Sequence, residues 1–292
     1  MDQAEKLRNM IKEHKASKEA DSNGARVITI TSGKGGVGKS STAVNLAIQF
    51  RKLGYRVMIF DADFGLANIE IMFGAIPKFN LSDVIYRGKN LEDIIVEGPM
   101  GVKFISGGSG VFEMTNMSSD NLRYLTAKLS QLEAMTDIII VDTGAGISES
   151  VLQFITSCNE VVLITTPEPT SITDSYALLK ALKRHPDYDK ESTAVKVITN
   201  RVSNEEEGKT LFSKLSIVVN KFLQIELAHL GMIPHILKSV MEQQPVSIAY
   251  ENSGASKAYE VIAKRLTQNE KEKVSEKRGI SFMFAKMFKS KT

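Results

Sequence analysis

A glycine-rich segment between a predicted strand and a predicted helix constrains this chain more than any other feature. It fits the pattern G-x-x-x-x-G-K-[ST] over Gly33-Lys34-Gly35-Gly36-Val37-Gly38-Lys39-Ser40. The β-branched run Val27–Thr31 precedes it, and an apolar-periodic helix is predicted over Ser40–Leu53. Such a loop turns backbone N–H groups toward phosphate oxygens, and the helix N-terminus adds a favourable partial charge. The segment therefore predicts a nucleotide-phosphate site.

Four side chains of this segment have predicted roles. Lys39 would reach the β- and γ-phosphates, the Ser40 hydroxyl would bind Mg²⁺, and Ser41 would donate to the α-phosphate. Lys34 is not needed by an ordinary phosphate-binding loop. It is either an exposed surface charge or a second cation that reaches a nucleotide across a dimer, as an arginine finger does.

Three acids follow predicted strands. Asp142 closes the apolar run Ile138–Val141, at the sheet edge where the phosphate loop lies, and it would hold Mg²⁺ through water. Asp61 and Asp63 follow the run Val57–Phe60. One of the two acids would orient Mg²⁺ or the phosphate loop, and the other would orient the attacking water. We favour Asp63 as the acid that orients the water, with Asp61 in support. Plain turn acids are the alternative.

Short buried runs alternate with helical patterns over residues 26–266. Further strand-like runs are Val102–Ile105, Val161–Ile164, Val195–Thr199 and Ala228–Ile233. Helical patterns between them include Asn121–Met135 and Ser171–Arg184. Strands buried on both faces and separated by helices predict an α/β fold of the P-loop NTPase type. Its doubly wound, mostly parallel sheet would carry helices on both faces.

Composition limits the class of protein. The 292 residues carry a net charge of +3, too little to indicate nucleic-acid binding by itself. With Cys158 alone, an internal disulfide and a cysteine-built metal site are excluded, which suits a reducing cytosol. No run approaches the ~20 apolar residues that span a bilayer, and the charged start from Asp2 onward does not fit a signal peptide. We expect a cytoplasmic protein whose membrane contact is peripheral.

The segments that flank the α/β domain have different compositions. Residues 1–12 predict a short amphipathic helix, and residues 13–25 and 267–279 read as linkers. Residues 280–292 form an apolar and basic tail. On a helix, one face of the tail would collect Ile280, Met283, Phe284, Met287 and Phe288. This pattern predicts a membrane-targeting helix. The alternative is a helix docked on its own domain, and a nucleotide-dependent switch would allow both.

The motifs together resemble the MinD/ParA family of ATPases over most of residues 26–266. Lys34–Ser41 resembles the deviant Walker A motif, Phe60–Asn68 switch I, Ile138–Asp142 Walker B and Thr143–Gly146 switch II. The resemblance implies that ATP and Mg²⁺ bind, that ATP joins two subunits which separate with ADP, and that hydrolysis is slow.

The same resemblance assigns roles to individual residues. Lys39 would be the P-loop lysine, Lys34 would cross the dimer and Asp63 would position water. Asn200 would read the adenine edge and Arg201 would pack on the ring, with the segment Gly231–Pro234 closing on the base. Several relatives carry an acid shortly after this proline, whereas His235-Ile236 follow here, which puts the base contacts there in doubt.

Residues 2–8 resemble the D-Q-A-x-x-L-R segment of the FlhG family of flagellar-number regulators, also called YlxH or FleN. The matching residues are Asp2, Gln3, Ala4, Leu7 and Arg8. The resemblance implies that this segment stimulates FlhF, a signal-recognition-particle-type GTPase. It also implies binding to flagellar switch-ring (C-ring) proteins of the FliM, FliN or FliY type and to the inner membrane leaflet. A frayed, solvated terminus is the alternative.

Two further functions are compatible with the same domain. A MinD-like regulator of the division site differs mainly in lacking residues 2–8. A ParA-like partition ATPase would bind DNA, but Lys180, Lys183 and Arg184 make only a modest basic cluster, so nucleic acid is not an expected partner.

Overall fold

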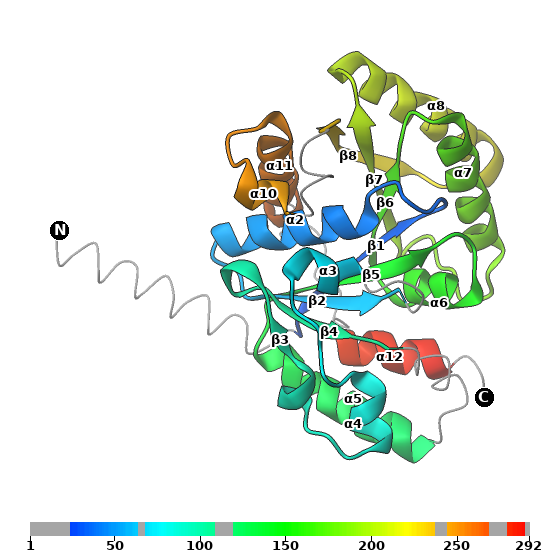
Figure 1. The fold of residues 1–292 in the computed structure, drawn as a ribbon. Coiled ribbons are helices and arrows are strands. Elements are labelled where there is room, and N and C mark those ends of the chain that lie inside the picture. Colours follow the sequence, from blue (N-terminus) through cyan, green and yellow to red (C-terminus); the bar gives the residue numbers. More distant parts are fainter. Residues whose placement is uncertain (1–23, 64–67, 109–118, 237–243, 269–278, 290–292) are drawn as a thin grey trace, which may run out of the picture.

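The computed structural model describes residues 24–63, 68–108, 119–236, 244–268 and 279–289. Its centre is an eight-stranded sheet of order β3-β4-β2-β5-β1-β6-β7-β8 (Figure 1). The strands are β1 (Arg26–Ser32), β2 (Val57–Ala62), β3 (Val96–Glu97), β4 (Lys103–Ser106), β5 (Ile138–Ala145), β6 (Glu160–Thr165), β7 (Ala194–Val202) and β8 (Leu227–Pro234). All neighbouring strands are parallel except β3 and β4.

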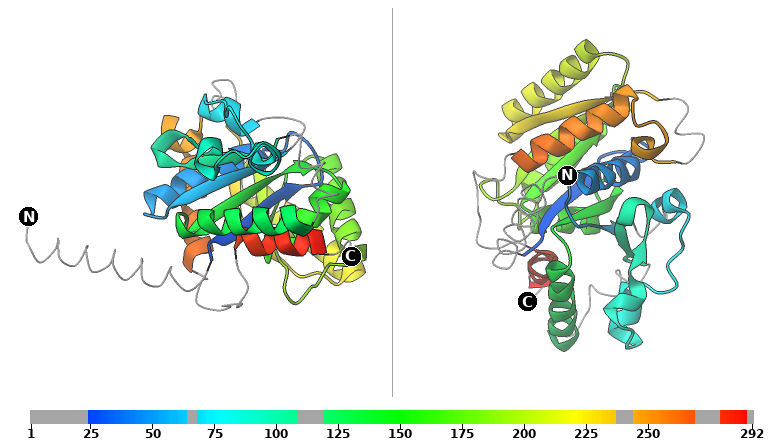
Figure 2. Two further views of the ribbon diagram at one scale, coloured as in Figure 1. Left: turned by 90° about the horizontal axis from the view of Figure 1, so that it is seen from below. Right: turned by 90° about the vertical axis from the view of Figure 1, so that its left-hand side faces the viewer.

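Helices cover both faces of this sheet (Figure 2). One face carries α2 (Lys39–Lys52), α3 (Asn68–Phe73), α10 (Val246–Ala249) and α11 (Gly254–Gln268). The other carries α4 (Leu81–Tyr86), α5 (Ser119–Ala134), α6 (Glu149–Ser157), α7 (Pro169–Arg184), α8 (Glu205–Leu223) and α12 (Ile280–Lys289). Short 3₁₀ turns, η1 (Leu91–Ile94) and η2 (Pro99–Gly101), flank β3.

The strands read as continuous apolar runs because both of their faces are buried. In β5, Ile138 and Ile140 pack under α2, whereas Ile139 and Val141 pack toward α5 and α12. This alternation between two cores is what a parallel sheet covered on both sides requires. The predicted α/β class and each predicted strand are confirmed. The two-residue β3 was not predicted, since it is too short to leave a hydrophobic period.

The C-terminal tail is docked on its own domain. In α12, the side chains of Ile280, Met283, Phe284 and Met287 are buried against α5 and α6. The ring centroid of Phe284 lies 5.6 Å from that of Phe60 in β2 and 6.4 Å from that of Phe154 in α6. The docked alternative is therefore what this structure contains, and the side chain of Phe288 lies outside the described residues.

Polar contacts fix both ends of the docked helix. The carboxylate of Glu133 in α5 accepts hydrogen bonds from the backbone N–H and the hydroxyl of Ser281, each at 2.7 Å. Nearer the other end, Lys286 Nζ donates to the carbonyl oxygen of Thr156 at 2.5 Å. Among the described residues, no helix has the length and apolar character that a bilayer-spanning segment needs. The predicted activator helix, residues 1–12, lies outside the described residues, as does nearly all of both predicted linkers.

Candidate nucleotide site

The predicted phosphate loop connects β1 to α2 at the carboxyl edge of the sheet. Gly36 and Gly38 have φ angles of 76° and 96°, a conformation that glycine adopts without a steric penalty. No side chain of the described residues caps the N-terminus of α2. The first N–H groups of this helix are thus available to an anion, as in other phosphate sites at helix N-termini.

Two glycines of the loop are required by close packing. A Cβ atom on Gly33 would lie 2.2 Å from the backbone carbonyl of Asp174 in α7. A Cβ atom on Gly38 would lie 2.5 Å from the side-chain nitrogen of Asn200 in β7. The loop is therefore held between two neighbouring elements as well as by its own turns.

Two predicted acids meet beneath the loop. Asp61 and Asp142 are register partners on the adjacent strands β2 and β5. Burial raises the pKa of Asp61 to about 8, and the nearby Asp142 carboxylate adds to the rise. Burial also raises the pKa of Asp142 to about 7, against the opposing effects of the Ser40 hydroxyl and the Lys39 ammonium. Both shifts have the sign that desolvation gives a buried carboxylate.

The oxygen atoms of this acid pair fit a divalent cation. Within the described residues, neither carboxylate oxygen of Asp142 accepts a hydrogen bond of normal geometry, and Asp61 Oδ2 lacks one as well. Mg²⁺ prefers oxygen ligands and retains waters, with one or two carboxylates and substrate phosphates completing its shell. The Ser40 hydroxyl and this acid pair make a suitable donor set for Mg²⁺ bound to a nucleotide.

Asp63 lies at the second predicted position, beside the C-terminal end of β5. Its backbone N–H donates to Asp61 Oδ1 at 3.0 Å. A Cβ atom built on Gly144 would lie 3.8 Å from Asp63 Oδ1, which places the carboxylate next to the predicted switch II segment. The side chain is only partly buried, so water reaches it, as a water-positioning acid requires.

Lys34 is paired within its own subunit. Its Nζ atom lies 2.6 Å from Glu168 Oε2 and 2.7 Å from Thr170 Oγ1. Glu168 is the N-cap residue of α7, and Thr170 lies in its first turn. The hydrogen bond and charge of Lys34 lower the pKa of Glu168. Sequence reasoning did not find Glu168, because 134 residues separate the partners and neither carries a motif for the pair.

The predicted adenine-site residues also lie at this edge. The Asn200 side chain donates to the carbonyl oxygen of Val37 in the phosphate loop at 2.8 Å and accepts from the N–H of Arg201 at 2.9 Å. Arg201 has a φ of 59°, unusual for a side chain larger than asparagine. Pro234 pairs with Val202 across β7 and β8. Asn200 therefore supports the loop directly, a contact that the sequence did not predict.

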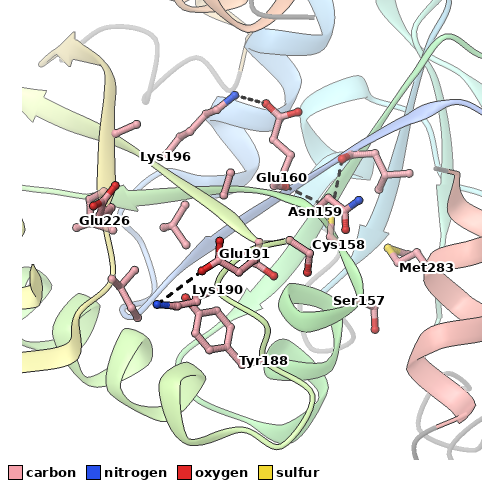
Figure 3. A pocket seen from close by; sticks show the side chains of 18 of the residues that line it. Ser157, Cys158, Asn159, Glu160, Tyr188, Lys190, Glu191, Lys196, Glu226 and Met283 are labelled. Carbon is pink, nitrogen blue, oxygen red and sulfur yellow. Dashed lines mark hydrogen bonds and ion pairs between the residues drawn. The ribbon is translucent and has the colours of Figure 1, made fainter. Parts of the chain in front are cut away.

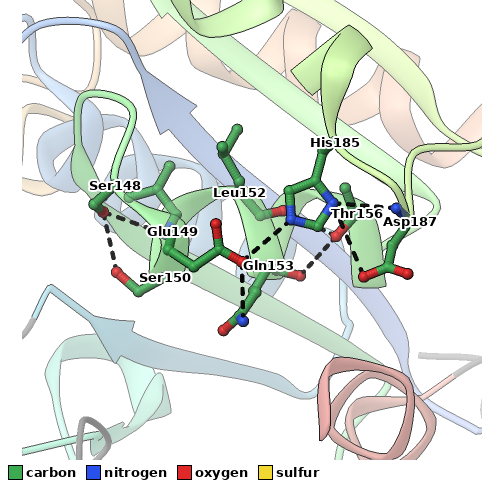
Figure 4. A network of polar contacts seen from close by, with 9 residues as sticks. Ser148, Glu149, Ser150, Leu152, Gln153, Thr156, His185 and Asp187 are labelled. Carbon is green, nitrogen blue, oxygen red and sulfur yellow. Dashed lines mark hydrogen bonds and ion pairs between the residues drawn. The ribbon is translucent and has the colours of Figure 1, made fainter. Parts of the chain in front are cut away.

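A polar network joins α6 to α7 next to the switch II segment (Figure 4). Glu149, in the first turn of α6, accepts from Gln153 at 3.2 Å and lies 3.4 Å from His185 Nε2. His185 Nδ1 accepts from the N–H of Asp187 at 3.2 Å. Ser148 caps α6 shortly after the predicted switch II segment, and the network connects the first turn of this helix to the C-terminal end of α7.

A cavity of about 760 Å³ lies at the opposite edge of the sheet, where β1, β6, β7 and β8 begin (Figure 3). On its wall, Glu160 forms ion pairs with Arg26 at 2.8 Å and with Lys196 at 2.5 Å. The residues with predicted nucleotide contacts do not line this cavity. We therefore locate the candidate site at the phosphate-loop edge, which has the matching chemistry.

Comparisons with known proteins agree with this geometry. The family model described as ParA, NUBPL iron-transfer P-loop NTPase, matches residues 23–267. The chain belongs to the MinD/ParA family of P-loop ATPases. Within this family it is 40% identical over 244 residues to the antiactivator FleN of Pseudomonas aeruginosa, covering 82% of this chain and 86% of FleN. It is 34% identical over 249 residues to the flagellum site-determining protein YlxH of Helicobacter pylori, covering 84% of this chain and 82% of YlxH.

Solved structures of the MinD/ParA family share the fold. A chain of the MinC:MinD cell division complex of Aquifex aeolicus superposes with a TM-score of 0.64 at 25% identity, covering 87% of this chain and 99% of the other. MinD of Pyrococcus horikoshii in complex with Mg-ADP superposes with a TM-score of 0.63 at 24% identity, covering 86% and 100%.

Proposed function

We propose that this protein is an ATP-hydrolysing switch that binds and releases the membrane and controls flagellar number and placement. The acid pair beneath the phosphate loop carries the enzymatic part of the proposal. Within the part of the chain that the structure describes, three buried oxygens of this pair accept no hydrogen bond of normal geometry, and Asp142 lies near Lys39 and Ser40, as Mg²⁺-dependent phosphoryl transfer needs. Bound Mg²⁺ would supply charge neutralisation at the phosphates. Lys39 holds the β- and γ-phosphates, and Asp63 orients the attacking water.

Dimerisation requires a change at Lys34. In the described conformation its ammonium is held by Glu168 and Thr170 of the same subunit. An exposed ion pair of this kind is weak, so a nucleotide phosphate on a second subunit can compete for the lysine. We propose that ATP joins two subunits, each Lys34 reaching the other's nucleotide, and that ADP returns them to monomers.

We propose that release of the docked tail is how the nucleotide state controls membrane binding. Phe284 packs on Phe60, which directly precedes Asp61, and on Phe154 of α6, the helix that follows switch II. A shift of either segment on ATP binding would loosen the dock and expose the apolar face of α12. The released helix would enter the cytoplasmic leaflet, and two tails on one dimer would bind by avidity.

The flagellar role is supported by relatives. FleN is named an antiactivator and YlxH a flagellum site-determining protein, and both align over most of this chain. We propose that residues 2–8 stimulate FlhF and that the ATP-bound form engages C-ring proteins. A MinD-like role at the division site is the second candidate, favoured by several MinD relatives at 28–30% identity. The flagellar role predicts that a peptide of residues 2–8 accelerates GTP hydrolysis by FlhF, whereas the division-site role predicts no acceleration.

One experiment tests the membrane switch. Purified protein is sedimented with anionic vesicles in ADP or ATP, as wild type, as Asp63→Ala to hold the ATP state, and without residues 280–292. We expect ATP to drive the first two onto vesicles as dimers and the truncated chain to stay in solution. Binding that ignores nucleotide or tail would refute the switch. Salt-sensitive DNA binding would support a ParA-like role instead.

A further inference from the structure

The C-terminal half of α8 exposes large apolar side chains. Ile217, Val218 and Phe222 are 63%, 41% and 64% exposed. The opposite face of this helix is already buried in the core, through Leu211, Leu215, Val219 and Leu223. The second half of α8 is thus apolar on two sides, which a helix that only covers a sheet does not need.

Cations without carboxylate partners surround these side chains. Lys214 and Lys221 lie on the exposed side of the same two turns, and neither forms an ion pair among the described residues. The Nζ atom of Lys221 lies 5.5 Å from the centroid of the Phe222 ring. By contrast, Lys209 in the first half of the helix is paired with Glu205. We call Lys214, Ile217, Val218, Lys221 and Phe222 the α8 patch.

The α8 patch lies at the edge of the sheet to which the tail is tethered. Helix α8 packs on β7 and β8, and α11 packs on β8, where Arg265 Nη1 donates to the carbonyl oxygen of Leu230 at 2.8 Å. The last described residue of α11 is Gln268, and ten residues separate it from Gly279. Ten extended residues span at most ~33–36 Å. A tail released from α5 and α6 therefore begins within that distance of the end of α11, the helix that packs on β8.

The cavity at the edge of the sheet where β1, β6, β7 and β8 begin is lined both by residues after α8 and by residues of the tail. Its lining includes Gln224 and Glu226, directly after α8, and Gly279 and Phe282, at the start of α12 (Figure 3). The end of α8 and the start of the tail thus border one depression at the edge opposite the phosphate loop.

We propose that the α8 patch is a second membrane contact that acts together with the released tail. Ile217, Val218 and Phe222 enter the boundary between headgroups and acyl chains, and Lys214 and Lys221 meet anionic headgroups. This inference rests on the proposed membrane switch. It adds a second surface that explains how one short helix achieves stable attachment, since a tethered second contact multiplies affinity through effective concentration.

Two other occupants fit less well. A second copy of this chain would bring like cations together if the patch faced itself across a two-fold axis. A stable protein partner needs about 800 Å² on each side, far more than three side chains supply. A membrane sets no such minimum, because the tail already holds the protein at the surface.

The test uses the full chain carrying Asp63→Ala, with ATP. Vesicles are phosphatidylcholine alone or with phosphatidylglycerol. The double variant Ile217→Ser/Phe222→Gln is compared with Val261→Ser, a control on α11 that is 48% exposed in the parent. We expect the double variant to lower the vesicle partition coefficient roughly 10-fold or more and the control to leave it unchanged. ATP-dependent dimerisation and circular dichroism should stay as in the parent.

A second measurement reports contact directly. Cys158 is buried, so an introduced Ile217→Cys can be labelled selectively with an environment-sensitive fluorophore. Its emission should shift to the blue when phosphatidylglycerol vesicles are added with ATP, and the shift should vanish without residues 280–292. If the parent binds vesicles through its tail, the double variant binds equally well and the labelled Ile217→Cys protein shows no shift, then the α8 patch does not contact the membrane and this inference is overturned. If the parent itself does not bind, the proposed switch fails first.

Discussion

Removing the carboxylate that holds the first turn of α12 should release the tail without changing the tail itself. Glu133 Oε1 accepts two hydrogen bonds from Ser281, both at 2.7 Å, and it lies at the N-terminus of α12, where a negative charge is favourable. Hydrogen bonds to a charged group contribute ~1.5–3 kcal/mol each when buried. These are partly exposed, so we take about 2 kcal/mol for both, which raises the undocking constant about 30-fold.

The assay for Glu133→Ala is vesicle sedimentation with ADP, in which the wild-type tail is docked. We expect the variant to bind anionic vesicles with ADP up to about 30-fold more strongly than wild type, and equally with ATP, since that state has already released the tail. Glu92→Ala is the matched control, because it removes the same charge from an exposed site in η1, which has no proposed membrane contact. Unchanged ADP-state binding by a folded Glu133→Ala protein would refute the reasoning that docking restrains the tail.

Three further predictions address the nucleotide site. Glu168→Gln should free Lys34 and tighten the ATP-bound dimer about two- to five-fold by analytical ultracentrifugation; a weaker dimer would mean that the acid assists assembly. Because burial raises the pKa of Asp61 to about 8 and of Asp142 to about 7, well above 3.8, the folded apo-protein binds more protons than the unfolded chain. The stability that these two acids contribute should therefore be fully present near pH 4 and be lost as the pH rises toward 8. In thermal melts, bound Mg-ATP should weaken this dependence of the melting temperature on pH, relative to Asp142→Asn. Gly38→Ala should abolish nucleotide binding in calorimetry, since the residue has a φ of 96° and a methyl group would lie 2.5 Å from a side-chain amide.

The sequence was sufficient for the sheet and for the phosphate edge. Hydrophobic runs defined the parallel strands because a strand buried on both faces has a distinctive continuous pattern. The loop before Ser40 and the acid Asp142 could be placed together because the carboxyl ends of parallel strands meet at one edge of a sheet. Both predictions depend on local patterns and on one general rule of topology.

Other features could not be read from local patterns. An amphipathic helix such as α12 has the same sequence whether its apolar face meets lipid or a protein groove, so the docked position needed tertiary structure. The Lys34–Glu168 pair and the Asn200 contact with the phosphate loop join distant parts of the chain. The sequence around each of these residues contains no motif that identifies the residue it contacts.

The central claim is that nucleotide state controls the docking of α12. Hydrogen–deuterium exchange of the amides in Ile280–Lys289 tests it most directly, with Asp63→Ala compared in ADP and in ATP, without lipid. We expect strong protection with ADP, where the helix is buried against α5 and α6, and rapid exchange with ATP. Equal protection in the two nucleotides, with ATP-dependent dimerisation intact, would contradict it.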